Sequence, residues 1–144
     1  MFSVTEVVTI ARPRSDVFAY LTDAGRRPEW DDTVISEALT SPPPVGVGST
    51  IHSRMRVMGR EVDFDWRVTE YVPPGRMAIV STKGTFPTSL LFELTDDGAA
   101  TRVSATIDGE PSGMLRLVEP MIEDTIRSTL ATGLGRVRQI LESR

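Results

Sequence analysis

The residues that could carry acid–base chemistry are few, and the single histidine comes first. His52 is the only imidazole in the 144 residues, and there is no cysteine. Any Ser-His-Asp mechanism or histidine base would therefore have to use His52. The strand pattern described below places His52 beside Asp65, on the polar side of a hairpin. We interpret the two residues as a solvent-exposed cross-strand pair and assign His52 no catalytic role.

Glu6 is the candidate for a general acid or base. It shares one strand face with Val4, Val8 and Ile10. A carboxyl among apolar residues on a cavity wall is held in its neutral form more readily than one in water, which suits acid–base catalysis. The alternative is that this edge of the sheet is turned over, so that Glu6 is in water and Val7 is buried. The sequence leaves both open.

Other familiar sites are not supported by the spacing of the residues. Gly46-Val47-Gly48 lacks the third glycine of a dinucleotide-binding fingerprint, and a predicted strand follows it instead of a helix. Asp23, Asp31 and Asp32 are close enough in sequence to suggest a cation site, but aspartate is common at helix ends and in turns, and we assign them to those positions. With one histidine and no cysteine, a zinc site is not expected. We predict neither a metal nor a cofactor.

Composition restricts the partners and the compartment. The net charge is -4, and the chain has one lysine and scattered arginines. A nucleic-acid partner is therefore not expected, because binding phosphates needs clustered basic residues. No run approaches eighteen apolar residues, and the amino end lacks the order of a signal peptide. We expect a single domain over residues 1–144, cytoplasmic and without a membrane span, in an oligomeric state that the sequence leaves open.

The element around which the chain is organised is a helix at the carboxyl end. Pro120 should either kink this helix or mark its first turn. Glu123 falls close to its start, where a negative charge is favourable. Gly133 costs ~1 kcal/mol relative to alanine, either to make room for a ligand or to let a strand approach. The apolar residues recur at steps of three and four and so form one stripe: Ile122, Ile126, Leu130, Leu134, Val137 and Leu141.

A helix with one apolar face needs a broad surface to lie on, and a sheet in the middle of the chain supplies it. Thr50–Val57 and Arg60–Tyr71 predict a hairpin that turns at Met58-Gly59. Pairing Val57 with Arg60 gathers the charges on one face, whereas a one-residue slip would mix both faces. The inner pairs are then Met55–Val62, Ser53–Phe64 and Ile51–Trp66, and the outer pairs are Arg56–Glu61, Arg54–Asp63 and His52–Asp65.

The remaining elements complete an antiparallel sheet. In the last hairpin we pair Thr95 with Ala100, which sets Glu93 opposite Arg102 and turns Leu90, Phe92, Val103, Ala105 and Ile107 inward. Short links between successive strands predict antiparallel pairing. The expected fold is α+β, a curved sheet of about seven strands around the terminal helix, with two short helices after the first strand. The other strands are predicted at Phe2–Ile10, Thr33–Leu39, Met77–Thr82, Ser89–Thr95 and Ala100–Asp108.

Short segments occur along the chain in the order found in a known superfamily. They are Ile10-Ala11-Arg12-Pro13 before Val17-Phe18, Leu21-Thr22-Asp23, Pro28-Glu29-Trp30, Val47-Gly48-Ser49, Gly59, and Gly98 with Thr101-Arg102-Val103. With the apolar terminal helix, they make the whole chain resemble the SRPBCC superfamily of START domains and birch-pollen-type allergens. Within it, the chain looks most like the polyketide cyclase/dehydrase and lipid-transport family. The resemblance implies a helix-grip fold with an apolar cavity between sheet and helix, used by relatives that include both enzymes and carriers.

We therefore expect a small hydrophobic ligand, lipid-like or polyketide-like, to bind in that cavity. One alternative is an aromatase/cyclase or dehydratase-type enzyme that uses the same cavity, with Glu6 as its catalytic candidate. Another is a protein-interaction module with a closed core and an exposed apolar patch around Phe86. The residues expected to line the cavity are Trp30, Ile51, Ser53, Met55, Phe64, Trp66, Leu90, Phe92, Val103, Ile126, Thr129, Leu130 and Gly133.

Overall fold

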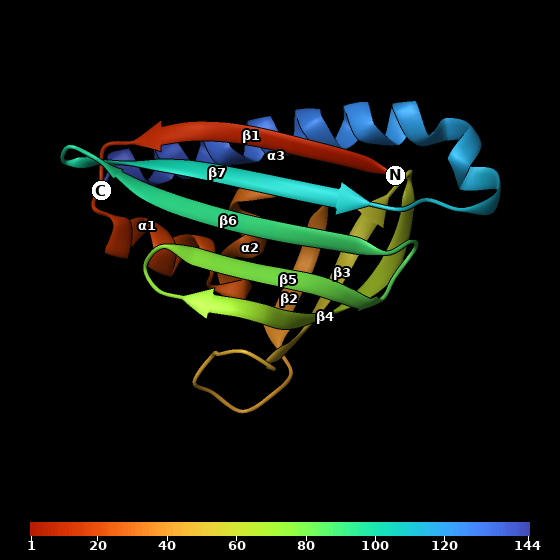
Figure 1. Cartoon of the computed structure of the whole chain (residues 1–144), viewed down its shortest axis with the longest axis horizontal. Coiled ribbons are helices and arrows are strands. Elements are labelled where there is room, and N and C mark those ends of the chain that lie inside the picture. The colour runs from red at the N-terminus through yellow and green to blue at the C-terminus, as the bar shows by residue number, and fades with distance from the viewer.

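The computed structural model describes all residues, Met1–Arg144, and shows a curved antiparallel sheet folded around a long helix (Figure 1). The strand order is β1-β7-β6-β5-β4-β3-β2, so strands adjacent in the chain are adjacent in the sheet except where β1 joins β7. The seven-stranded helix-grip architecture is thus as predicted. The strands are β1 (Phe2–Ile10), β2 (Val34–Leu39), β3 (Thr50–Val57), β4 (Arg60–Val72), β5 (Arg76–Lys83), β6 (Thr88–Asp97) and β7 (Ala100–Gly109).

The helices lie on one side of this sheet. Between β1 and β2 come α1 (Arg14–Leu21), the 3-10 turn η1 (Ala24–Arg26) and α2 (Arg27–Trp30). After β7 the chain forms a second 3-10 segment, η2 (Gly113–Val118), and then α3 (Glu119–Glu142), which runs behind β1 and β7 in Figure 1. Pro120 lies in the first turn of α3 and does not kink it. None of the helices is long and apolar enough to cross a membrane.

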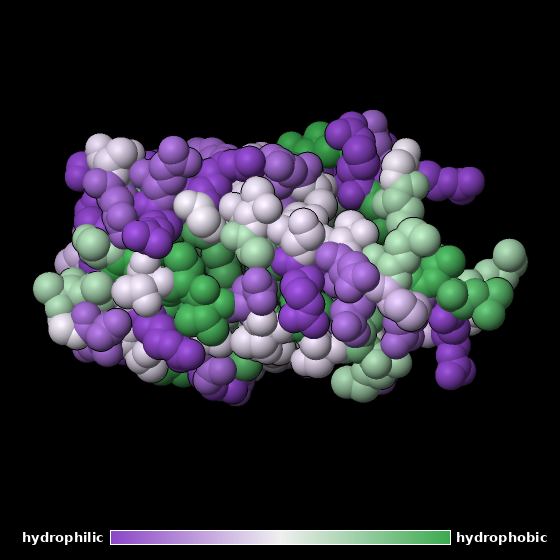
Figure 2. All heavy atoms as spheres, turned by 90° about the horizontal axis from the view of Figure 1, so that it is seen from above, coloured by the Kyte–Doolittle hydropathy of each residue, from purple (hydrophilic) through white to green (hydrophobic).

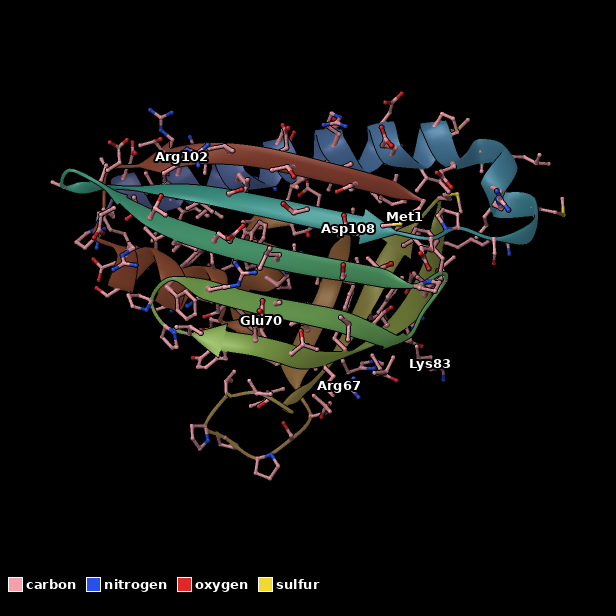
Figure 3. All side chains as sticks on the ribbon, in the orientation of Figure 1. Met1, Arg67, Glu70, Lys83, Arg102 and Asp108 are labelled. Atoms are coloured by element: carbon pink, nitrogen blue, oxygen red, sulfur yellow. The ribbon has the colours of Figure 1, made fainter.

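The register predicted for the β3–β4 hairpin is confirmed at every pair, from Val57 with Arg60 to His52 with Asp65. On the outer face, an Arg54 nitrogen donates to Asp63 at 3.1 Å, and His52 Nδ1 lies 2.7 Å from Asp65 Oδ1. Figure 3 shows the same polarity further along β4, where Arg67 and Glu70 point away from α3. The polar face therefore lies outside and the apolar face turns toward the helix.

The register predicted for the last hairpin is wrong by two residues. Asp97, and not Thr95, pairs with Ala100, and Glu93 faces Ser104 instead of Arg102. The reason is a tight two-residue turn in which Gly98 has a φ of 63°, a conformation that glycine adopts without strain. A slip of two residues leaves every side chain on its original face, so the inward residues are the predicted ones.

Gly133 makes room for neither a ligand nor a strand. A β-carbon at this position would lie 3.1 Å from the ring and from the carbonyl oxygen of Trp30, which is fully buried at the end of α2. The missing side chain therefore lets α2 pack against α3. Both interpretations offered by the sequence are replaced by a close contact between two helices.

Candidate functional site

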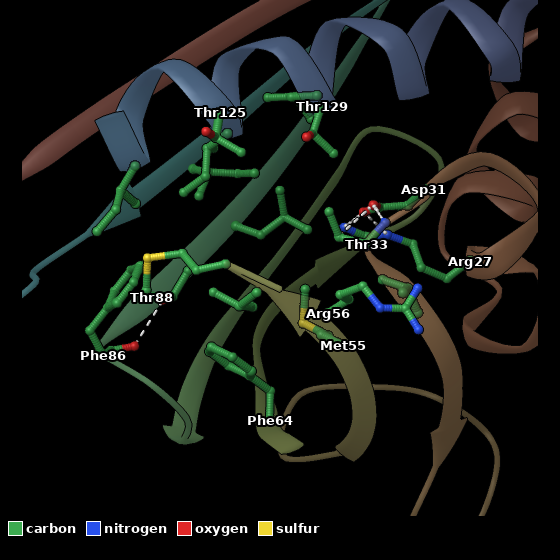
Figure 4. A pocket seen from close by; sticks show the side chains of 18 of the residues that line it. Arg27, Asp31, Thr33, Met55, Arg56, Phe64, Phe86, Thr88, Thr125 and Thr129 are labelled. Carbon is green, nitrogen blue, oxygen red and sulfur yellow. Dashed lines mark hydrogen bonds and ion pairs between the residues drawn. The ribbon is translucent and has the colours of Figure 1, made fainter. Parts of the chain in front are cut away.

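A cavity of about 180 Å³ lies between the inner face of the sheet and the first half of α3 (Figure 4). Its walls are mostly hydrophobic and come from α2, β2–β7 and α3. Phe64 and Trp66 are stacked, with ring centroids 5.3 Å apart, and both contribute to the wall. Because an apolar cavity of roughly 150 Å³ accommodates benzene, this space is large enough for an aromatic ring or a short aliphatic segment.

The cavity opens between the β3–β4 turn and the start of α3. Met58 in that turn is 55% exposed and Met121 in the first turn of α3 is 65% exposed, yet both line the cavity. Hydrophobic side chains also gather at this end of the surface in Figure 2, where η2 is located, and Met114 and Leu117 of η2 are among the most exposed apolar residues. An apolar molecule would therefore meet an apolar rim before it enters.

The thirteen residues predicted to line the cavity divide into two groups. Those brought together on its walls are Met55, Phe64, Trp66, Leu90, Ile126, Thr129 and Leu130. Those placed elsewhere are Trp30, Ile51, Ser53, Phe92, Val103 and Gly133. The second group faces inward as expected, but it is covered by other side chains: Phe92 packs on Trp30, and Ser53 lies behind Trp66 and accepts its indole N–H at 3.1 Å.

Glu6 is not on the cavity. Glu6 is on the inward face of β1 and Val7 on the opposite face is exposed, so the strand is not turned over. However, this part of β1 packs along α3 and away from the cavity, and the Glu6 carboxylate lies 4.0 Å from the guanidinium of Arg127. Glu123 is close to the same arginine, at 3.6 Å. These three residues form a half-exposed ionic group at the seam between β1 and α3.

His52 and Phe86 were also singled out in the sequence, and neither is a catalytic or exposed docking residue. His52 is not on the cavity; its hydrogen bond with Asp65 is the main cause that raises the pKa of the imidazole above 6.5. Phe86, expected to be exposed if the protein were an interaction module, is buried and lines the cavity. The interior is also not closed, so neither feature that would favour an interaction module is present.

A buried ion pair forms one end of the cavity (Figure 4). Arg27 Nε donates to Asp31 Oδ2 at 3.0 Å, and Nη2 lies 3.0 Å from the same oxygen. Asp31 Oδ1 accepts from the backbone N–H and the hydroxyl of Thr33, at 3.0 and 2.7 Å. The Arg27 guanidinium also lies 4.5 Å from the centre of the Trp30 ring. Both oxygens of Asp31 are thus occupied, and Arg27 is held rigidly.

Beside this pair lies Glu37, a cavity residue that the sequence analysis did not identify. A register shift between Val34 and Ser36 lets both Val34 and Glu37 face inward, although residues three apart in a regular strand face opposite sides. The side chain of Glu37 is half-buried and lines the cavity. Desolvation raises the pKa of its carboxyl above 4.5, whereas the charge of Arg27 and the hydrogen bond from Ser53 lower that pKa. One signal in the sequence could have identified it: Glu37 is two residues from the apolar Leu39, and residues two apart in a strand lie on the same face.

A second hollow, of about 690 Å³, lies between α1, the loop after β2 and the β4–β5 turn, against the inner-face residues Ile51 and Met77. Its rim includes exposed residues such as Asp23, Gly25 and Pro73. Such a wide depression removes little of a ligand from water, so the smaller inner cavity is the stronger candidate for binding.

The antiparallel sheet, the terminal helix and the apolar space between them define the helix-grip class. The profile of the family described as polyketide cyclase / dehydrase and lipid transport matches residues 1–142, and the chain belongs to that family. The family expected from the sequence is therefore confirmed, and the resemblance to START domains and birch-pollen-type allergens is confirmed at the level of the fold. No curated protein matches the chain in sequence.

Solved structures share this fold at low sequence identity. TTHA0849 from Thermus thermophilus has a TM-score of 0.83 at 17% identity and covers 96% of this chain and 95% of its own. A START superfamily protein from Mycobacterium smegmatis has a TM-score of 0.80 at 19% identity, with 96% and 98% covered. Ara h 8.0201 has a TM-score of 0.74 at 11% identity, with 99% of each chain covered. These similarities establish the fold and leave the ligand undefined.

Proposed function

We propose that the protein binds a small hydrophobic molecule, lipid-like or polyketide-like, in the cavity between the sheet and α3. The observation that carries this proposal is the cavity itself, because well-packed protein interiors rarely leave apolar space of this size unfilled. The family's description, polyketide cyclase / dehydrase and lipid transport, supports the same ligand class. Burying each Å² of apolar ligand surface contributes ~25 cal/mol toward binding before the costs of association.

Binding of a naphthalene dye whose fluorescence rises in apolar surroundings, 1-anilinonaphthalene-8-sulfonate, tests this proposal. We expect saturable binding to the wild-type protein and strong weakening in Thr129→Phe, because Thr129 lines the cavity and a larger ring would fill it. The matched control is Thr132→Phe, one turn further along α3, where the side chain is exposed and off the cavity. Equal binding by both variants would place the dye elsewhere and contradict the proposal.

An enzymatic use of the same cavity is the second candidate, and Glu37 is the observation that favours it. Its carboxylate could take a proton from a CH₂ group between two carbonyls of a bound polyketone. The resulting enolate carbon would then bond to a ketone carbon of the same chain, and the alkoxide formed would recover the proton from Glu37. DynU16, described as a putative protein in the dynemicin biosynthetic locus, shares the fold with a TM-score of 0.69 at 17% identity; the match covers 97% of this chain and 47% of that one. Cyclisation of a synthetic triketone by wild type but not by Glu37→Gln would support this candidate.

A further inference from the structure

The polar end of the cavity contains one oxygen that is still available to a ligand. Asp31 accepts hydrogen bonds through both of its oxygens. Glu37, in contrast, accepts one hydrogen bond, through Oε1, from the hydroxyl of Ser53 at 2.6 Å. The only buried side-chain polar atom without a partner is Trp30 Nε1. Glu37 Oε2 therefore has no partner within the protein and is accessible.

The direction of the hydrogen bonds behind Glu37 is fixed by the chemistry of the groups. The Trp66 indole N–H can only donate, and it donates to Ser53 Oγ at 3.1 Å. The single proton of Ser53 is then directed to Glu37 Oε1 at 2.6 Å. Oε1 is therefore already an acceptor, with one lone pair occupied by Ser53. Oε2 keeps both of its lone pairs free for a proton or for a hydrogen bond donated by a ligand.

The charges around this oxygen favour a ligand group that donates. Asp31 and Glu37 are the two carboxylates on the cavity, and Arg27 is already paired with Asp31 at 3.0 Å. The other arginine that lines the cavity, Arg56, is exposed and lies 3.7 Å from Glu61. Glu37 is therefore left without a counter-ion of its own, in surroundings where desolvation raises its pKa. An ionised carboxylate beside an apolar cavity is costly unless something donates to it.

We propose that Glu37 Oε2 accepts a hydrogen bond from a hydroxyl group of the ligand, so that the protein selects hydrophobic molecules carrying a hydroxyl at the end that enters first. This rests on the proposed binding function, since it assigns a role to one wall of the same cavity. The apolar body would lie against Phe64, Trp66 and Ile126. The hydroxyl would reach the end formed by α2 and β2, away from Phe86 and Thr88 (Figure 4).

The test compares two probes of nearly equal size, 1-naphthol, which can donate a hydrogen bond, and 1-methoxynaphthalene, which cannot. Their dissociation constants are measured by isothermal titration calorimetry at pH 7. We expect wild type to bind 1-naphthol about tenfold more tightly, the scale of a buried hydrogen bond to a charged group. In Glu37→Gln, the amide oxygen can keep the bond to Ser53, which turns the NH₂ toward the cavity as a donor. The preference for 1-naphthol should fall to about onefold, and 1-acetylnaphthalene, which only accepts, should bind more tightly than to wild type.

The controls separate the two proposals. 1-Methoxynaphthalene has only an ether oxygen, a weaker acceptor than the ketone of 1-acetylnaphthalene, so it should gain less affinity from Glu37→Gln than 1-acetylnaphthalene does. Glu6→Gln should leave every affinity unchanged because Glu6 lies off the cavity. If neither naphthalene binds wild type, the proposed binding function fails. If both bind wild type equally, the cavity function stands and the hydroxyl selectivity is overturned. This last comparison needs no variant, so it holds even if Glu37→Gln does not fold.

Discussion

The two halves of α3 cover different interiors, although one apolar stripe runs along both. In the second half, Leu134, Val137 and Leu141 are at most 2% exposed and line neither of the two hollows. In the first half, Ile126 and Thr129 face the cavity. The spacing of the residues is the same, and β1 runs along both halves. What differs is the second surface, which is Trp30 of α2 beside the second half and a receding sheet beside the first. A single helix can therefore stabilise the fold with one half and form a binding site with the other.

The largest effect expected from this comparison is on stability. Leu134→Ala should lower the free energy of unfolding by about 2–5 kcal/mol, the range for a leucine that leaves a cavity in a packed core. Ile126→Ala should cost clearly less, because its side chain already lacks contacts on the side facing the cavity. Urea unfolding of both variants measures the difference. Equal losses would show that the two halves of α3 are packed alike.

The two glycines of α3 sharpen the same comparison. Gly133→Ala should destabilise the protein by about 1 kcal/mol net, because the overpacking cost against Trp30, ~1–3 kcal/mol, exceeds the ~1 kcal/mol gained in helix propensity. Gly135 has no neighbour that a β-carbon would meet, and it is exposed. Gly135→Ala should thus stabilise by up to ~1 kcal/mol. Thermal unfolding of the two variants measures both effects. If Gly133→Ala stabilised the protein, Trp30 would have to move to make room for the added methyl group.

The next effect concerns the pH dependence of stability at the hollow end. Because the carboxyl of Glu37 has a pKa raised above 4.5 by desolvation, the folded state binds more protons than the unfolded state between 4.5 and that raised value. The contribution of Glu37 to the free energy of unfolding therefore falls as the pH rises through this window. Glu37→Gln should remove this fall. The free energy of unfolding of the variant should therefore rise relative to that of wild type as the pH increases from 4.5 toward neutrality. Parallel stability curves over that window would contradict the assignment.

The smallest effect belongs to the outer face of the β3–β4 hairpin. Asp65 raises the pKa of His52 above 6.5, so the stabilisation from this pair is fully present below pH 6.5 and is lost as the pH rises through the raised value. For such an exposed pair it amounts to ~0.2–1 kcal/mol. Since His52 is the only histidine, an NMR titration follows one imidazole signal. A midpoint at or below 6.5 would refute the pairing, and Asp65→Asn should lower it.

The local sequence pattern was sufficient to predict the helices and strands and the register of the β3–β4 hairpin. The alternation of charged and apolar residues from Thr50 to Tyr71 excludes a one-residue slip, and the turn at Met58-Gly59 selects the pairing that the structure has. The last hairpin was less constrained, because a slip of two residues keeps Thr95 and Ala100 on the same faces. The pattern therefore predicted which residues face inward there, but the turn at Gly98 decided which residues pair.

The site was predictable only in part. An inward direction follows from strand parity, and seven of the residues expected on the cavity are there. Whether an inward residue meets empty space or a neighbour depends on elements far away in the chain: Trp30 from α2 fills the place beside Gly133. Glu37 escaped detection because the irregularity after Val34 interrupts the alternation of β2.

The sequence by itself determined the order of the strands and helices, the two faces of the sheet and the stripe of α3, because side-chain periodicity is a local property of the backbone. Only the tertiary structure decided where the interior is solid and where it is hollow, and that Glu37 rather than Glu6 is the carboxyl in the hollow part. The physical reason is that a cavity is a relation between surfaces. It depends on how far the sheet curves away from the helix, and no residue encodes that distance alone.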